Sequence, residues 1–153
     1  MTTDQRQQIE ELVYQSCLAL DEQDFKGYLE LCDKSFRYSI TAFSPEIRKD
    51  MTWLDHDKSG METLFTNLPR HNSDHSPLTR HATVYRISRE GERAEVVSAL
   101  QVFRTALDGG STELLAVGRY HDTIKLDADA PKLLKRVVKL VTRELGIGHH
   151  IPF

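Results

Sequence analysis

The stretch that decides the fold is TRHATVYRIS (79–88), RAEVVSALQVFRTAL (93–107) and STELLAVGRYHDTIKL (111–126). Each segment is rich in β-branched, aromatic and other apolar residues. Glycine-containing turns, REGE and LDGG, separate one segment from the next. Apolar runs bounded by such turns are typical of strands joined by hairpins. The three segments therefore predict a meander of three long antiparallel strands.

Helical periodicity precedes this meander. Thr2 and Gln5 have the spacing of a capping box, and the apolar residues that follow recur at helical intervals. We therefore expect a first helix over residues 4–20. A second, short helix is expected to begin at Asp24, a residue type that caps helix N-termini well, and to end near Asp33.

Residues 35–43 (SFRYSITAF) then switch to a period of two, which predicts a strand with one apolar face. Residues 44–58 are polar and irregular. A connection of this length in a small domain is often a functional or interface loop. We expect Trp53 to anchor a contact there.

A third helix is predicted from Ser59 and Glu62, which form a second capping-box pattern, to Pro69, which should end it. The segment KLLKRVVKLVTREL (132–145) fits a helix and a strand equally well by periodicity. Helices packed on one face of a curved antiparallel sheet form an α+β fold. No linker or repeat interrupts the chain, so residues 1–153 are expected to form a single domain.

Composition narrows the function classes. The 153 residues carry a formal net charge of −3, which does not suit a nucleic-acid partner or an anionic membrane surface. The N-terminus does not resemble a signal peptide, and no apolar run is long enough to span a membrane. We therefore expect a soluble, cytoplasmic protein. Cys17 and Cys32 are expected to be buried thiols.

Metal-binding patterns are weak. His71 and His75 have the spacing of two ligands on a helix, but helix-breaking residues surround them. No compact pair of histidines with a carboxylate predicts a non-haem iron centre. Neither cysteine is followed within a few residues by a histidine, as the ligand pairs of a Rieske cluster would be. The expectation is that this chain holds no metal or cofactor.

Two histidines on predicted strands could act in catalysis. If His81 and His121 faced one cavity with Asp21 or Asp24, a His/Asp pair could serve as general acid and base. The competing interpretation is that these are hydrogen-bonded polar side chains on a sheet face covered by another subunit. Arg119 should share a strand face with His121.

The basic residues near the end of the chain form either a solvated face or a row of interface ion pairs. They are Lys135, Arg136, Lys139 and Arg143.

Read in order, several segments resemble the small (β) subunit of Rieske-type aromatic-ring-hydroxylating oxygenases. They are ALDEQDFKGYLELC (19–32), FRYSI (36–40), LDHDKSGMETLFTNLPR (54–70), SPLTRHATVYRI (76–87), GRYHDTI (118–124), LLKRVVKLVTREL (133–145) and the tail GIGHHIPF (146–153). The resemblance implies the cone-shaped α+β fold shared with nuclear transport factors, ketosteroid isomerases and SnoaL-like proteins, with three helices on one face of a curved, mixed sheet. It also implies that residues 133–145 form a strand.

The resemblance implies a non-catalytic, structural function. In such oxygenases the α subunit holds the Rieske 2Fe–2S cluster, the mononuclear iron and the substrate pocket. The β subunits form a homotrimer that supports it, giving an α3β3 hexamer. The compound degraded would be aromatic, although RHNSDHSPLTRH (70–81) also resembles alkanesulfonate-type relatives. The family's arginine in the third helix and its asparagine after the strand entry are not matched at residues 63–67 and 88–89.

On this interpretation the candidate interface residues are Trp53, Arg80, Arg119 and Arg136. One open sheet face would carry Arg119, His121, Arg136 and Thr142, and residues 44–58 and 70–80 would contact the α subunit. Two alternatives use the same fold. The chain could be a stand-alone pocket enzyme, such as a dehydratase, isomerase or cyclase with a His/Asp pair, or a small-molecule binding or dimerising module.

Overall fold

The computed structural model describes residues 1–71, 75–126, 129–143 and 152–153, and not the side chains of residues 70 and 71. Three helices are present in these ranges, α1 (Thr3–Asp21), α2 (Phe25–Glu30) and α3 (Lys58–His71). The strands are β1 (Cys32–Ser44), β2 (Lys49–Asp57), β3 (Leu78–Glu90), β4 (Arg93–Thr105), β5 (Thr112–Lys125) and β6 (Lys132–Leu140).

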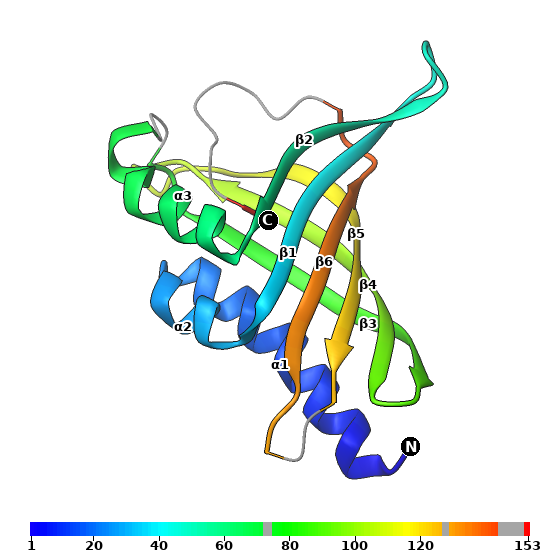
Figure 1. The fold of residues 1–153 in the computed structure, drawn as a ribbon. Helices are drawn as coiled ribbons and strands as arrows, with labels where there is room; N and C mark the ends of the chain where they lie inside the picture. The colour runs from blue at the N-terminus through cyan, green and yellow to red at the C-terminus, as the bar shows by residue number, and fades with distance from the viewer. Residues whose placement is uncertain (72–74, 127–128, 144–151) are drawn as a thin grey trace.

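The six strands form one mixed sheet in the order β2-β1-β6-β5-β4-β3. All neighbours are antiparallel except β1 and β6, which run parallel. The sheet curls around the helices, so that all three lie on its inner side (Figure 1). The predicted α+β fold, the meander β3–β4–β5 and the strand assignment of the last segment are confirmed.

Helix starts follow the local sequence. The Thr2 side chain and the Gln5 side chain cap each other's backbone amides, as the capping box predicts. The Asp24 carboxylate accepts a hydrogen bond from the Gly27 amide at 2.9 Å and begins α2. That helix ends at Glu30, three residues earlier than predicted, because Cys32 already pairs with Leu133 of β6.

The third helix differs from its prediction at both ends. Its N-terminal amide, that of Gly60, is capped by the Asp57 carboxylate at 2.8 Å. The predicted Ser59–Glu62 box is therefore not the cap. Pro69 lies inside the last turn of α3, which continues to His71, rather than ending the helix.

The predicted loop over residues 44–58 is wrong. Most of it is β2, which pairs with β1 from Ser44–Lys49 to Arg37–Asp57. None of the residues of this edge strand is fully buried, so few of them are apolar and the period of two is not visible. The β1–β2 hairpin projects from the body of the molecule (Figure 1).

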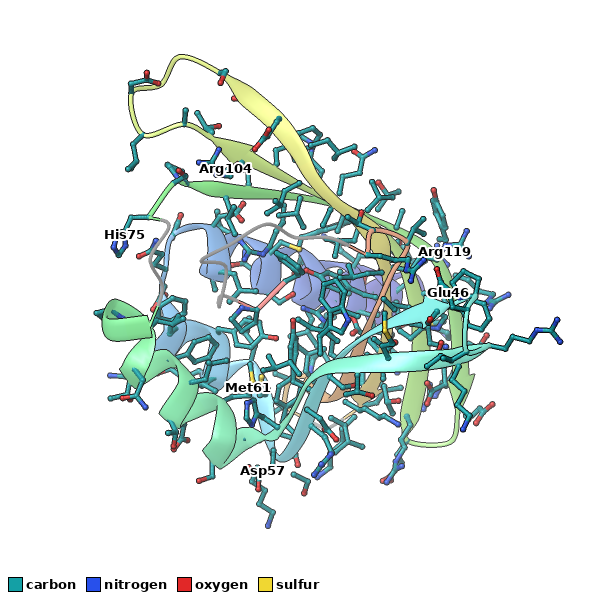
Figure 2. All side chains as sticks on the ribbon, turned by 90° about the horizontal axis from the view of Figure 1, so that it is seen from above. Glu46, Asp57, Met61, His75, Arg104 and Arg119 are labelled. Atoms are coloured by element: carbon teal, nitrogen blue, oxygen red, sulfur yellow. The ribbon has the colours of Figure 1, made fainter. Side chains whose placement is uncertain are left out.

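The core lies between the helices and the inner face of the sheet. Both cysteines are buried free thiols, as expected. Met61 of α3 is fully buried and points toward this core (Figure 2). Among the residues that the structure describes, no helix is both long enough and apolar enough to cross a membrane.

Candidate functional site

Strand β5 divides its polar side chains between the two faces of the sheet. Tyr120, Asp122 and Ile124 point inward and are buried, whereas Arg119, His121 and Thr123 point outward. Figure 2 shows Arg119 on the side of the molecule away from α3. Arg119 and His121 share one face of the strand, as predicted, so β5 has one buried and one outward face.

The centre of the inner face is a buried ion pair. Arg136 of β6 and Asp122 of β5 are directly opposite each other in the sheet, and both are 0% exposed. Arg136 donates from Nε and Nη2 to the two Asp122 carboxylate oxygens at 2.8 and 2.9 Å. Its Nη1 donates to the Ser16 hydroxyl of α1 at 2.9 Å. Burying two charges away from water costs free energy, and hydrogen bonds of this kind are needed to offset that cost.

The Arg136 guanidinium also stacks on Tyr120, with Cζ 3.8 Å from the ring centroid. Burial works to lower the pKa of Arg136, but the Asp122 carboxylate outweighs it and holds this pKa well above its ordinary value. The residue is therefore charged and inward-facing. Its predicted position on the open face beside Arg119, and its candidacy as an interface residue, are wrong.

The reason lies in strand parity. Arg136 shares its face with the buried Val138 and Leu140, while Lys135 and Lys139 point to the other side. Lys135, Arg136 and Lys139 therefore do not form one row of basic side chains, because Arg136 points to the opposite face. A strand assignment with the period of two applied strictly would have placed Arg136 in the core.

A second internal ion pair joins α1 to β3. Arg80 Nη1 donates to Asp21 Oδ1 at 2.7 Å, and the Arg80 backbone amide donates to both Asp21 oxygens at 3.1 and 3.2 Å. The Arg80 side chain is fully buried. Arg80 therefore lies inside the chain, not on the surface where an interface residue was expected.

The last two residues close the inner face. The Phe153 amide donates to the Tyr38 hydroxyl at 2.8 Å, and the Tyr120 hydroxyl donates to the Phe153 carbonyl in a short hydrogen bond. Arg80 donates to the carbonyls of Phe153 and Pro152, at 3.3 and 2.7 Å. The tail therefore joins β1, β3 and β5 on the inner face.

The outer face is different in character. Strands β3 to β6 form a hollow of about 650 Å³ there. Its polar lining is His81, Thr83, Tyr85, Gln101, Arg119, His121 and Lys139. Apolar side chains accompany these groups, and Tyr85 and Val141 are 61% and 76% exposed. Within the described ranges, Arg119 and Lys139 make no ion pair.

The hollow is positively charged. The pKa of His121 is lowered, first by partial burial and then by the positive charge of Lys139, with Arg119 and Arg86 adding to the effect. A histidine between cations, with exposed aromatic and aliphatic groups alongside, suits contact with another protein surface.

The structure separates His121 from both aspartates of the predicted His/Asp pair. His121 lines the outer hollow, whereas Asp21 is held by Arg80 and Asp24 caps α2. His81 and Asp21 do border one shallow hollow of about 330 Å³ beside α1. There, however, both Asp21 oxygens accept hydrogen bonds from Arg80, and the His81 ring packs against Phe103 at 5.0 Å.

No group of three or more histidine, cysteine or acidic side chains that could hold a metal ion occurs in the described part of the chain. His75 is exposed beyond the end of α3 (Figure 2). The side chain of His71 lies outside the described residues, so the proposed pair is not tested.

The β1–β2 hairpin presents a second exposed apolar surface. Phe43 and Ile47 are more than half exposed near its tip. Trp53 is only partly buried and packs against the core from β2. At the base of the hairpin tip, Arg143 binds both Glu46 oxygens, at 3.1 and 2.7 Å, and the Glu46 pKa falls to about 2 because of this hydrogen bonding.

Comparison with known proteins agrees with this geometry. The model of the SnoaL-like domain matches residues 1–137. The β subunit of the methanesulfonate monooxygenase hydroxylase of Methylosulfonomonas methylovora is 40% identical over 149 residues, covering 92% of this chain and 82% of the relative. The chain belongs to the SnoaL-like family of oxygenase β subunits.

Two further matches extend this family assignment. The β subunit of 2-aminobenzenesulfonate 2,3-dioxygenase from an Alcaligenes species is 33% identical, with 94% of this chain and 96% of the relative covered. A protein of Novosphingobium aromaticivorans, inferred to be an aromatic-ring-hydroxylating dioxygenase β subunit, has the same fold, with a TM-score of 0.79, 18% identity and 95% of each chain covered. The resemblance read from the sequence is confirmed.

Proposed function

We propose that this oxygenase β subunit is non-catalytic and supports an α subunit that carries a Rieske 2Fe–2S cluster, a mononuclear iron and the substrate pocket. The observation that carries the proposal is the contrast between the two sheet faces. Inside, Arg136 binds Asp122, Arg80 binds Asp21, and the Tyr120 hydroxyl binds the chain's own tail. Outside, the cations of the hollow are without ion-pair partners in the described residues.

The proposed assembly is a homotrimer within an α3β3 hexamer, in the cytoplasm. A second copy of this chain would cover the outer hollow, because exposed Tyr85 and Val141 beside Arg119 and Lys139 provide an apolar centre with a polar rim. Closed threefold symmetry makes such a contact heterologous, so the hollow would meet a different patch on the neighbouring copy.

The α subunit would contact the β1–β2 hairpin. The exposed Phe43 and Ile47 at its tip are the apolar residues available there, and the Arg143–Glu46 pair braces the tip against the end of β6. Residues 44–58 were predicted to contact the α subunit as a loop. In this proposal the same contact is made by the β1–β2 hairpin, which contains most of that segment.

The substrate class proposed for the complex is an organosulfonate, aliphatic or aromatic. Support comes from the relatives at 40% and 33% identity, whose names specify methanesulfonate and 2-aminobenzenesulfonate. In this proposal the sulfonate is bound and oxygenated in the α subunit, so no residue of this chain touches it.

The test is purification of the tagged chain from its native host, followed by mass spectrometry. We expect a co-purifying protein with Cys-x-His and Cys-x-x-His ligand pairs, and sulfonate-dependent oxygen consumption only in fractions that contain both chains. Replacement of Phe43 and Ile47 by serine should release that partner, whereas Leu107→Ser, at a still more exposed apolar site on the β4–β5 turn, should not. A chain that purifies alone and turns over a small substrate would contradict the proposal.

A further inference from the structure

The end of the chain is bound by side chains from three strands. Tyr38 of β1, Arg80 of β3 and Tyr120 of β5 converge on Pro152 and Phe153, which are both buried. Four hydrogen bonds therefore hold two residues. The ring of Phe153 is 1% exposed and belongs to the main apolar cluster.

Arg80 and Tyr120 are also held by groups other than the tail. Arg80 is fixed by three hydrogen bonds to Asp21. The Tyr120 ring lies under the Arg136 guanidinium, and its hydroxyl is also 3.7 Å from Cys17 Sγ. Burial raises the pKa of Tyr38 and Tyr120 above the ordinary value, so both remain neutral phenols able to donate or accept. Preorganised donors of this kind are typical of ligand sites.

We propose that the cone interior contains a binding site for an aromatic group with a neighbouring carbonyl or carboxylate oxygen, and that Pro152 and Phe153 occupy it as an internal ligand. Arg80 and Tyr120 would bind the oxygen, Tyr38 would accept from an adjacent N–H, and the apolar cluster would enclose the ring. The ligand class is therefore N-acylated phenylalanine and similar aromatic acids or amides. The proposal does not depend on the assembly proposed above.

A purely structural role for the tail makes a different prediction. If the tail only stabilises the fold, its removal should let the surrounding side chains collapse. If it occupies a site, its removal should leave unpaired donors at Arg80 and Tyr120 that a free ligand can satisfy, because buried donors without partners cost free energy.

The experiment is calorimetric titration of a chain that lacks residues 152 and 153 with N-acetyl-Pro-Phe. We expect one molecule bound per chain, at least tenfold weaker binding of N-acetyl-Pro-Ala, and no binding of either probe to the full chain. In the shortened chain, Tyr120→Phe should weaken binding severalfold. Tyr28→Phe is the matched control, since the buried Tyr28 hydroxyl has no hydrogen-bond partner among the described residues.

A shortened chain that folds but does not bind N-acetyl-Pro-Phe at millimolar concentration, or binds the alanine probe equally well, would overturn the proposal. If the shortened chain does not fold, the full chain with Phe153→Ala decides. A cavity left by a buried ring, on the order of 150 Å³, can bind benzene, so benzene should raise the Tm of this variant and not that of the unaltered chain. No response to benzene, or failure of this variant to fold even with benzene present, would overturn the proposal equally.

Discussion

Both faces of the sheet carry basic side chains, but the buried ones on the inner face are paired with carboxylates, whereas those lining the outer hollow have no such partner in the described ranges. Inside, Arg136 and Arg80 each have a carboxylate partner and are buried. Outside, Arg119 and Lys139 surround a partly buried histidine and have no carboxylate partner among the described residues. One strand, β5, contributes to both environments at successive positions.

This difference indicates where the chain's function lies. Polar groups that satisfy one another inside a core contribute to stability and to a unique fold. Charged groups left at an exposed hollow beside apolar side chains are instead available to a partner surface. The comparison predicts that inner-face substitutions change folding, whereas outer-face substitutions change association.

The largest expected effect is the loss of stability caused by a substitution on the inner face. Asp122→Ala leaves the Arg136 charge buried without its carboxylate and should lower the free energy of unfolding by about 3–5 kcal/mol. Urea denaturation followed by circular dichroism measures this change. The control is the double variant Asp122→Leu with Arg136→Met, which removes both charges and should recover most of the loss. A cost below about 1 kcal/mol for Asp122→Ala would show that the pair is not the centre of the core.

The next effect is on assembly. Arg119→Glu should leave the free energy of unfolding within about 0.5 kcal/mol of the unaltered chain, because the residue is exposed. It should weaken self-association by about tenfold or more, as removal of a charge at an interface does. Analytical ultracentrifugation measures the association. Lys34→Glu, an equal charge change at an exposed site outside the hollow, is the control. Loss of folding in Arg119→Glu, or equal association in both variants, would break the distinction between the faces.

Sequence patterns predicted the architecture well where alternation was strong. The meander, the first helix and the caps at Thr2 and Asp24 required only local periodicity and side-chain chemistry. The edge strand β2 could not be recognised because none of its residues is fully buried, so it has no continuous apolar face. The last segment needed the family resemblance, since its periodicity fits two structures.

The contacts of the interior were harder to predict for a physical reason. Arg136 lies 14 positions from Asp122 and Arg80 lies 59 positions from Asp21, so only the strand order and register bring the pairs together. A buried arginine contradicts the usual expectation for that residue type. The role of Phe153 depends on Tyr38 and Tyr120, 115 and 33 residues earlier.

A smaller effect is expected from pH. The lowered folded-state pKa of His121 means that the unfolded chain binds more protons between that pKa and the unfolded value near 6.5. Stability should therefore rise with pH through this window and be lost as the pH falls through it, by less than about 1 kcal/mol for a partly exposed group.

Denaturation at several pH values, with an NMR titration of the histidines, measures this dependence. His121→Gln should remove its contribution. Lys139→Gln should reduce it by raising the His121 pKa, whereas Lys135→Gln, four residues from Lys139 on the same strand face, should not. A His121 pKa above its ordinary value would contradict the positive character of the hollow.

The smallest expected effect is on metal content. The purified chain should hold no stoichiometric iron or zinc, because a tight site needs three or four converging ligands and none is found in the described residues. Elemental analysis after removal of the purification tag measures this directly. About one tightly held ion per chain would show that residues outside the described ranges complete a site.

Light scattering of the purified chain at micromolar concentration tests the central claim, that the outer face is an assembly surface, most directly. The account predicts a homotrimer with three times the 17.5 kDa mass of the chain, reduced toward the monomer by Arg119→Glu. A monomer at tens of micromolar, with the same mass for the unaltered chain and Arg119→Glu, would contradict it.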